Sequence, residues 1–451
     1  MRVLVVGLAV TGEAVVRHRA LAGDQVTVIE DRPGISIDWA QRASDARAAG
    51  AEVVEEPTAE HAAALGAAAD LVVPSPGVPE RHPAIAGARR HGVPVRSEID
   101  LAADVRGGPA IIAVTGTNGK TTVTTLTTAI LAAANIRVSA AGNIGRPLLD
   151  AVHDDVDVVV AEVSSFQLAF AERFAPRAAA LLNLGADHLD WHRTFDSYAR
   201  AKANVFARQG PDDVLVFNAD DPVVAGLAAA APGRRIPFSV ADGAAEGARL
   251  VDTAGGRLLV GPGGEELAQV DELPSARPVD VANDLAASAL ALDLGADARA
   301  AHEVVTTFEG LPHRMALVAE HEGVRWIDDS KATNVHATQA AVRGLERVVL
   351  VAGGRNKGVD LGELRNLVVQ LRAVVAIGDA AGEMEEAFAG AVPVVRAASM
   401  RAAVAAASEL AARGDTVLLS PGCASFDWYS SYAARGDDFA AEVRALVEVQ
   451  R

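Results

Sequence analysis

Short apolar runs alternate with alanine-rich stretches along most of the chain. Within the first hundred residues this pattern predicts strands at Val3–Val6, Gln25–Glu30 and Asp70–Pro74, with a helix at Gly12–Ala22. β-Branched residues favour strands, whereas alanine and leucine favour helices. Because strands separated by helices are typically joined by right-handed crossovers, the pattern predicts a parallel sheet and an α/β fold.

The same alternation resumes twice further along the chain. The predicted strands are Ala110–Val114, Val156–Val160, Ala178–Asn183 and Asp213–Asn218, and later Arg347–Ala352, Ala373–Ile377 and Thr416–Ser420. A strand-and-turn stretch from 234 to 272 and a helix at Asn283–Leu294 lie between the two groups. Composition changes near 95–104, and glycine and proline interrupt the pattern at 308–312. We therefore predict three domains, at 1–98, 99–310 and 311–451.

Length and composition agree with this division and narrow the class of protein. A chain of 451 residues exceeds what one hydrophobic core usually serves. The net charge of −18 and the lack of a basic run disfavour nucleic acid and anionic membranes as partners. The single cysteine, Cys423, excludes an internal disulfide and is expected to be a buried small hydrophobe. With no signal-peptide pattern and no long apolar span, we expect a cytoplasmic monomer.

The strongest motif is a phosphate-binding loop. Residues 115–122, Thr-Gly-Thr-Asn-Gly-Lys-Thr-Thr, follow a predicted strand and open a predicted helix. Glycines let backbone N–H groups face phosphates, Lys120 adds a positive charge, and the Thr121 hydroxyl can reach a magnesium ion. The usual spacing asks for glycine where this chain has Val114, so the loop is a variant. It predicts ATP as the nucleotide.

Three turns near the N-terminus are weaker indications. Gly7–Gly12 joins a predicted strand to a helix, but Ala9 occupies the middle glycine position of the dinucleotide fingerprint. Asp31 and Arg32 follow the next strand, and Ser75-Pro76-Gly77 follows another. Each of these alone fits plain turn structure as well as it fits nucleotide binding.

Polar residues also follow the strands of the middle segment. Glu162, in Glu-Val-Ser-Ser-Phe-Gln, and His188, in Asp-His-Leu-Asp, are predicted at the carboxyl ends of strands, where α/β sheets bind ligands. A carboxylate and an imidazole beside a phosphate loop suit magnesium binding. Lys202, in contrast, reads by itself as a solvated helical lysine.

In the last segment, four clusters together supply the cations and hydroxyl groups that phosphate and carboxylate binding requires. They are Leu-Pro-His-Arg at 311–314, Asp-Asp-Ser-Lys-Ala-Thr-Asn at 328–334, Gly-Gly-Arg-Asn-Lys at 353–357 and Ser-Pro-Gly-Cys-Ala-Ser-Phe-Asp at 420–427. One such cluster fits a surface loop, but four together indicate a binding face.

Taken in order, these motifs resemble the Mur ligase family, which builds the cytoplasmic peptidoglycan precursor of the cell wall. The resemblance covers essentially the whole chain. It implies a Rossmann-like N-terminal domain for a UDP-sugar, a central P-loop ATPase domain with a mainly parallel sheet, and a C-terminal Rossmann-like α/β domain. Residues 7–12 and 420–427 are similar to the D-glutamate-adding members, which implies UDP-N-acetylmuramoyl-L-alanine, D-glutamate and ATP as substrates and Mg²⁺ as the metal. Lys120, Glu162, His188 and Lys202 would be the catalytic residues.

The resemblance also implies binding roles, which are set out in order of ligand. The UDP end would contact Thr11, Gly12, Asp31, Arg32, Ser75, Pro76 and Gly77, and the muramoyl-alanine end Asn143. ATP would contact Gly116, Thr117, Asn118, Gly119, Lys120, Thr121 and Thr122, with Asn283 near the adenine and Arg314, Asp329 and Lys331 closing from the third domain. Magnesium would be held by Thr121, Glu162, His188 and a carbamate formed on Lys202. D-Glutamate would contact Thr333, Lys357, Ser425, Phe426 and Tyr432.

Two departures from the family pattern stand out. Asp280 replaces an asparagine that often contacts adenine, and Tyr432 adds a hydroxyl where an aromatic residue is expected. A folylpolyglutamate-type ligase is the alternative within the same class, although it should lack the N-terminal UDP turns. A non-catalytic nucleotide-sensing protein is an alternative from another class, and it would be expected to lose Lys120, Glu162 or His188.

Overall fold

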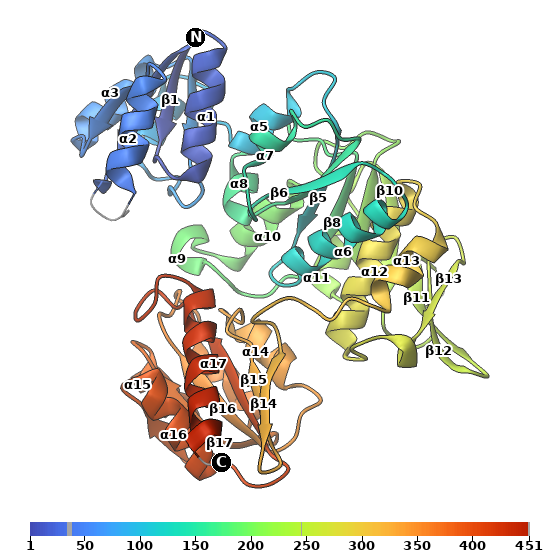
Figure 1. Ribbon diagram of the computed structural model, residues 1–451. Coiled ribbons are helices and arrows are strands. Elements are labelled where there is room, and N and C mark those ends of the chain that lie inside the picture. Colours follow the sequence, from blue (N-terminus) through green and yellow to red (C-terminus); the bar gives the residue numbers. More distant parts are fainter. Residues whose placement is uncertain (34–37, 245, 450–451) are drawn as a thin grey trace. The chain divides into compact units, whose positions relative to one another are not determined.

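The computed structural model describes residues 1–33, 38–244 and 246–449. The chain forms two compact units. The first comprises Met1–Leu184 with Ala199–Phe308, and the second comprises Gly185–Tyr198 with Glu309–Arg451. Figure 1 shows three separate sheets, two in the first unit and one in the second.

The first sheet is parallel and has the strand order β3-β2-β1-β4. Its strands are β1 (Arg2–Val6), β2 (Gln25–Glu30), β3 (Glu52–Glu55) and β4 (Leu71–Pro74), and its helices are α1 (Val10–Leu21), α2 (Trp39–Ala48), α3 (Ala59–Ala68) and α4 (Pro83–Arg90). The central strands are apolar and buried because helices pack around them (Figure 1). The carboxyl ends of β1, β2 and β4 meet at one edge.

Hydrogen bonds to α7 (Leu148–Ala151), which belongs to the second sheet's part of the chain, come from α1 and from the segment that follows the first sheet. Helix α5 (Glu98–Ala103) lies beside α7 (Leu148–Ala151), where Glu98 accepts a hydrogen bond from the Leu149 N–H at 2.6 Å. Asp150 accepts two hydrogen bonds from Arg17 of α1 at 2.8 Å. Burial raises the pKa of Glu98 to about 7.

The second sheet has nine strands in the order β13-β12-β11-β10-β9-β8-β5-β7-β6. They are β5 (Ala110–Thr115), β6 (Val138–Gly142), β7 (Val158–Glu162), β8 (Ala178–Leu181), β9 (Val214–Asn218), β10 (Arg234–Ser239), β11 (Ala248–Thr253), β12 (Gly256–Val260) and β13 (Glu266–Gln269). Strands β5 to β11 pair in parallel, and β12 and β13 add an antiparallel edge.

Two helices pack together beside this sheet and position the phosphate loop. Helix α6 (Lys120–Ala133) follows β5 directly, and α12 (Pro278–Asp293) packs against it. Their apolar side chains share one core with β5, β7 and β8. The remaining helices of this unit are α8 (Ser165–Ala169), α10 (Phe195–Ala203), α11 (Pro222–Ala228), α13 (Ala298–Val305) and the 3₁₀ turn Val270–Glu272. Of these, α10 begins in the segment that groups with the second unit.

The second unit contains a six-stranded sheet in the order β14-β15-β19-β16-β17-β18. Its strands are β14 (Ala316–His321), β15 (Val324–Asp328), β16 (Val348–Gly353), β17 (Leu371–Ile377), β18 (Val394–Arg396) and β19 (Thr416–Gly422). Only the β14–β15 pair is antiparallel within this described sheet. Its helical segments are α9 (Leu189–His192), α14 (Val335–Val342), the 3₁₀ helix Leu361–Leu367, α15 (Ala381–Phe388), α16 (Met400–Leu410) and α17 (Tyr432–Val449).

The predicted α/β fold with mainly parallel sheets is confirmed. One predicted strand of the middle segment, Val156–Val160, is displaced by two residues in the structure. The observed strand, β7, runs from Val158 and includes Glu162. Each sheet lies inside one of the three predicted ranges, 1–98, 99–310 and 311–451, whose boundaries stay predictions. Residues 185–198 group with the C-terminal unit, a feature that the sequence pattern did not indicate.

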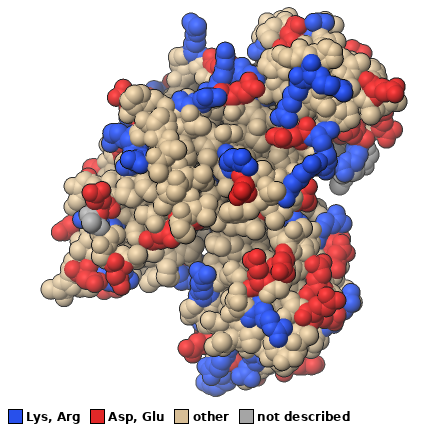
Figure 2. All heavy atoms as spheres, turned by 180° about the vertical axis from the view of Figure 1, so that it is seen from behind, with Lys and Arg blue, Asp and Glu red and all other residues tan. Residues whose placement is uncertain are grey.

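The face of the molecule drawn in Figure 2 carries charges of both signs. On the face drawn in Figure 2, lysine and arginine side chains are interspersed with aspartate and glutamate. Among the described residues, none of the helices combines the length and apolar character needed to cross a bilayer.

Candidate functional site

The phosphate loop joins the end of β5 to the start of α6, as the sequence predicts. Gly119 precedes the helix with φ +84°, a left-handed conformation that favours glycine. A Cβ there would lie 2.6 Å from the Asn283 Oδ1 of α12. Glycine is therefore required both by the backbone and by the close approach of Asn283, which is itself buried. This contact places Asn283 beside the loop.

A second asparagine, Asn183, lies two residues past the end of β8 and is hydrogen-bonded to the loop. The Asn118 N–H donates to Asn183 Oδ1 at 2.8 Å, and Asn183 Nδ2 donates back to the Asn118 carbonyl at 3.0 Å. The Thr117 N–H donates to the Asn183 carbonyl at 2.9 Å. Asn183 is absent from the predicted site. Its position as the last residue of a predicted strand was the only indication of its role.

Two lysines converge on one carbonyl of the loop. Lys120 Nζ donates to the Gly116 carbonyl at 3.0 Å and to the Thr117 carbonyl at 2.8 Å. Lys202 Nζ donates to the same Gly116 carbonyl at 2.7 Å and to Thr115 Oγ1 at 3.3 Å. Two ammonium groups that share an acceptor repel each other, and an anion between them would relieve that repulsion. The turn is therefore suited to bind a polyanion.

Lys202 is 2% exposed, so its interpretation as a solvated lysine is wrong. It lies on α10, a helix with few features of its own in the sequence. A buried ammonium must be hydrogen-bonded, and the carbonyl end of the turn supplies that bond. Its spacing from the loop, 82 residues away from Lys120, gave no local indication of this contact.

Glu162 connects the loop to the neighbouring strands. Its side chain is 3% exposed at the end of β7 and accepts a hydrogen bond from Thr121 Oγ1 at 2.7 Å. Its other carboxylate oxygen accepts from Asn143 Nδ2 at 2.8 Å, after the end of β6. The structure thus brings together three predicted site residues from β7, α6 and the turn after β6. Thr122 follows Thr121 at the start of α6 and is partly buried.

Glu162 and Thr121 offer the oxygen ligands that magnesium prefers. Within the described ranges, no three His, Cys, Asp or Glu side chains lie close enough together to hold a metal. A magnesium ion here would therefore take part of its ligands from water or phosphate, as is usual for this ion. His188 belongs to the second unit, where its backbone has φ +53° and its Nε2 lies 3.7 Å from Asp187 Oδ2.

The N-terminal turn has a different arrangement. The Leu8 N–H donates to Glu30 Oε2 at 3.0 Å, and Ser75 Oγ donates to the Gly7 carbonyl at 2.7 Å. Gly12 is buried in the first turn of α1, where a Cβ would lie 2.3 Å from the Gly7 carbonyl oxygen. Ser75 therefore holds the turn together. Thr11 lies partly buried on α1, and Pro76 and Gly77 follow Ser75 on a more exposed turn.

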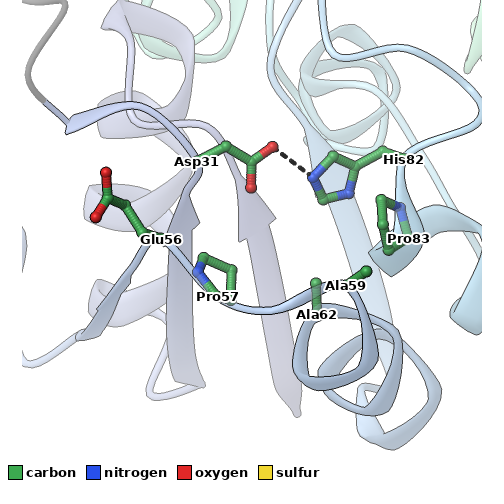
Figure 3. Close-up of a pocket in the computed structure, with 7 residues that line it drawn as sticks. All are labelled: Asp31, Glu56, Pro57, Ala59, Ala62, His82 and Pro83. Atoms are coloured by element: carbon green, nitrogen blue, oxygen red, sulfur yellow. Dashed lines mark hydrogen bonds and ion pairs between the residues drawn. The ribbon is translucent and has the colours of Figure 1, made fainter.

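A pocket of about 320 Å³ opens beside the carboxyl end of β2 (Figure 3). It is lined by Asp31, Glu56, Pro57, Ala59, Ala62, His82 and Pro83. His82 Nε2 lies 2.9 Å from Asp31 Oδ2. Arg32, in contrast, is exposed, and its N–H donates to Glu30 Oε1 at 3.1 Å. The structure thus places Asp31 at a pocket and leaves the neighbouring arginine at the surface.

In the C-terminal unit, the loop after β15 is held by its own carboxylates. Asp329 accepts hydrogen bonds from Ser420 Oγ at 2.9 Å and from the Met315 N–H at 3.3 Å. Lys331 Nζ lies 3.8 Å from the centre of the Tyr432 ring, a cation–π contact that explains an aromatic residue at this position. Asp329, Lys331 and Tyr432 are thus in one region, and Arg314, which is partly buried, directly precedes Met315.

Arg435 is a buried cation that the sequence motifs did not include. It is 1% exposed and donates to Ser330 Oγ and the Ser330 carbonyl at 2.9 Å and to the Cys423 carbonyl at 3.2 Å. Arg435 therefore ties the loop at 328–334 to the loop at 420–427. Burial lowers the pKa of Arg435 to about 10 and raises that of Cys423 to about 12. The prediction that Cys423 is buried is confirmed.

Lys357 forms an ion pair with Asp187 at 2.6 Å, within the second unit. Asn334 Nδ2 donates to Asp187 Oδ2 at 3.2 Å, so a loop after β15 and one after β16 meet the same carboxylate. The remaining predicted residues of this unit lie on these loops, with Thr333 partly buried, Ser425 buried and Phe426 64% exposed.

The substitution at position 280 has a local explanation. Asp280 lies in the first turn of α12 and accepts hydrogen bonds from Arg277 Nε at 2.8 Å and from Ser275 Oγ at 2.5 Å. Its carboxylate therefore closes the N-terminal turn of the helix, where a negative charge is also favoured by the helix dipole.

Comparison with known proteins finds likeness along nearly the whole chain. Residues 1–97 match the Mur ligase MurD-like N-terminal domain, residues 114–291 the Mur ligase middle domain, and residues 313–423 the Mur ligase glutamate ligase domain. A UDP-N-acetylmuramoylalanine–D-glutamate ligase of Frankia casuarinae is 45% identical, over 98% of this chain and 94% of the relative. The enzyme of that name from Geobacter metallireducens is 41% identical, over 98% and 97%.

Among solved structures, a MurF ligase from Thermotoga maritima in complex with ADP covers 95% of this chain and 96% of its own, with a TM-score of 0.62. At 16% identity this likeness concerns the fold alone. The three domain matches and the full-length relatives together lead to one conclusion: the chain belongs to the Mur ligase family.

Proposed function

We propose that this protein is an ATP-dependent ligase that joins D-glutamate to UDP-N-acetylmuramoyl-L-alanine in peptidoglycan precursor synthesis. Full-length relatives that carry this name, at 41–45% identity, support the substrates. The observation in the structure that carries the chemistry is the convergence of Lys120 and Lys202 on the Gly116 carbonyl. In a chain of net charge −18, this places two cations at a helix N-terminus, where phosphates bind.

The reaction has to overcome the low reactivity of a carboxylate. The substrate carboxylate oxygen attacks the γ-phosphorus of ATP, ADP leaves, and an acyl phosphate forms. The amine nitrogen of D-glutamate then attacks the acyl carbon, phosphate leaves, and the nitrogen loses a proton to give the amide. Positioning and charge neutralisation account for most catalysis in phosphoryl transfer.

The residues of the loop would divide this work. The N–H groups at the start of α6 and the Lys120 ammonium would bind phosphate oxygens, and Gly119 leaves space for them because it has no side chain. Asn283, beside Gly119, would lie near the adenine. Asn143 holds Glu162 and would contact the muramoyl-alanine end of the substrate.

Thr121 and Glu162 would hold magnesium, with His188 and a carbamylated Lys202 as further ligands. Their hydroxyl and carboxylate oxygens fit the donor preference of this ion. Bound magnesium neutralises the charge of phosphate oxygens. The hydrogen bond from Asn143 keeps the Glu162 carboxylate oriented toward Thr121, which is the contribution of the chain itself.

In the C-terminal unit, Lys357 would release Asp187 and bind a carboxylate of D-glutamate in its place. Thr333, Ser425, Phe426 and Tyr432 would surround the amino acid, and Arg314, Asp329 and Lys331 would approach ATP. We further propose three domains at 1–98, 99–310 and 311–451 and a cytoplasmic, monomeric enzyme.

A phosphate-release assay tests the assignment. ATP, magnesium and UDP-N-acetylmuramoyl-L-alanine are supplied with D-glutamate, L-glutamate, glycine or L-alanine in turn. Release is expected with D-glutamate alone among these. Release that responds to glycine or L-alanine but not to D-glutamate would overturn the assignment, and a dihydrofolate-type substrate serves as the comparison for the folylpolyglutamate class.

A further inference from the structure

His82 is a buried residue of the N-terminal pocket to which the sequence motifs give no role. Its side chain is 5% exposed, whereas that of Asp31, its partner, is 52% exposed. His82 caps helix α4, because its Nδ1 accepts a hydrogen bond from the Ala84 N–H at 3.2 Å. Pro83 lies between them and has no N–H to offer, so Ala84 presents the first amide of the helix.

This cap determines which ring nitrogen carries the proton. A nitrogen that accepts from an N–H is unprotonated, so the proton of the neutral ring lies on Nε2. Nε2 is then a donor, and the atom facing it at 2.9 Å is Asp31 Oδ2. A backbone amide thus fixes the tautomer, and the tautomer fixes one oxygen of the Asp31 carboxylate.

The second oxygen of Asp31 is directed toward the pocket. In Figure 3 it points to the side on which Pro57 and Ala62 lie, away from His82. The described lining of the pocket contains two carboxylates, Asp31 and Glu56, and no lysine or arginine. Such a pocket repels phosphate and accepts N–H or O–H donors carried on a flat, partly apolar group. The nucleoside part of a nucleotide has both properties.

We propose that His82 is a positioning residue, which orients the Asp31 carboxylate so that its free oxygen accepts a hydrogen bond from the nucleoside of the UDP-sugar. This inference rests on the proposed function, because it takes the nucleotide to be that of the substrate. His82 does not contact the ligand itself. A backbone amide at the start of α4 is thereby linked, through His82, to nucleotide recognition at the end of β2.

The test measures binding of UDP alone by calorimetry, without turnover. The variant His82→Ser keeps a side-chain acceptor for the Ala84 N–H, since serine is a good helix cap, but is too short to reach Asp31. We expect its UDP dissociation constant to rise about tenfold, as loss of a charge-assisted hydrogen bond implies. Asp31→Ala should weaken binding at least as much, and the double variant should bind no more weakly than Asp31→Ala.

The control is Asp297→Ala, which removes a side-chain cap from the distant helix α13. It should lower thermal stability while leaving the UDP dissociation constant unchanged. In steady-state assays, His82→Ser should raise KM for the UDP-sugar and leave kcat and the KM for ATP as they are. If His82→Ser does not fold, nitrogen NMR of the parent protein still tests the tautomer, which must show Nδ1 unprotonated.

Three outcomes would overturn the inference, and they differ in what else they affect. Unchanged UDP affinity in His82→Ser would overturn the role of His82 and leave the proposed function standing. The same holds if the double variant raises the UDP dissociation constant by the product of the two single effects. A ring protonated at Nδ1 in the neutral state would do the same. If the parent protein fails to bind UDP at all, the nucleotide-sugar part of the proposed function is lost as well.

Discussion

Two strand–turn–helix segments of the first unit share a backbone design and differ in charge. One turn joins β1 to α1 and contains Gly7 at φ +87°; the other joins β5 to α6 and contains Gly119 at φ +84°. At the first turn, the Leu8 N–H is occupied by the carboxylate of Glu30. At the second, amide groups and two lysines surround the loop. Glycine geometry thus supplies the turn in both, and the neighbouring side chains decide what it can bind.

The difference explains why the two turns suit different parts of a substrate. A carboxylate on the amides of the first turn competes with a phosphate for the same donors, and the nearby pocket is acidic too. Lysines at the second turn are suited to stabilise the negative charge that develops during the proposed phosphoryl transfer. Under the proposed function, recognition therefore falls to the first turn and chemistry to the second.

The largest effect is expected from Lys120→Ala, which removes one of the cations that distinguish the second turn. We expect kcat to fall by about 10²–10³-fold, the range seen when one preorganised charge-stabilising group is lost. Binding of UDP should not change, because the first turn is left intact. Phosphate release and UDP calorimetry measure the two effects; a variant that keeps a tenth of its activity would break the distinction between the turns.

A somewhat smaller effect is expected from Lys202→Ala, which separates two accounts of the second lysine. Activity should fall by about a hundredfold, because a buried charged group near the phosphates is lost. If Lys202 acts as a carbamate, acetate or formate should restore part of the activity, whereas methylamine should do so if the free ammonium is what matters. Phosphate release with each additive decides, and an absence of rescue by the acids would count against the carbamate.

These two lysines also show which parts of the site can be predicted from the sequence. Lys120 could be predicted because its role follows from local order: strand, glycines, lysine, threonine, helix. The same holds for the parallel sheets, since apolar runs and helices alternate regularly. Lys202 and Arg435 could not be predicted from their surroundings, because the carbonyl and hydroxyl oxygens that accept from them are brought near only by folding. Only the family resemblance drew attention to Lys202, and nothing in the motifs indicated Arg435.

His82 and Asn183 illustrate a further limit. Each acts on a neighbouring group, through a hydrogen bond whose partner lies far away in sequence. A sequence motif is defined by residue types at a fixed, short spacing. These hydrogen bonds depend instead on which strand ends lie at the same edge of a sheet. Asp31 was predicted at the UDP end, but its orientation by a histidine 51 residues later required the structure.

A smaller effect, on stability and UDP binding, is expected from a substitution at Gly12, which lies in α1 next to the first turn. In Gly12→Ala the new Cβ would lie 2.3 Å from the Gly7 carbonyl oxygen, so α1 must shift. We expect the free energy of unfolding to fall by about 2 kcal/mol and UDP binding to weaken, since overpacking moves the turn. ATP binding at the second turn should be unaffected. Chemical denaturation and calorimetry measure these changes.

The matched control is Gly226→Ala, in helix α11 of the same unit. Apart from its chain neighbours and the backbone of its own helix, no atom of the described residues lies within 4 Å of its added Cβ, so the substitution should raise stability by about 0.5–1 kcal/mol through helix propensity. Equal stability changes in the two variants would mean that the close approach at Gly12 does not constrain the first turn.

The last effect appears only as the pH changes, and it concerns Asp284, one residue past Asn283 on α12. Burial, with repulsion from Asp280, raises its pKa to about 8, against about 3.9 in an unfolded chain. Between these values the unfolded chain has lost a proton that the folded protein keeps. The free energy of unfolding should therefore fall as pH rises from about 4 to about 8 and level off above. In Asp284→Asn this contribution is absent, so the variant should be more stable than the parent by about 1–3 kcal/mol at pH 8.5, with the difference shrinking toward pH 5. Denaturation curves at both pH values measure this difference. Parallel pH profiles for parent and variant would show instead that Asp284 is ionised in the folded protein.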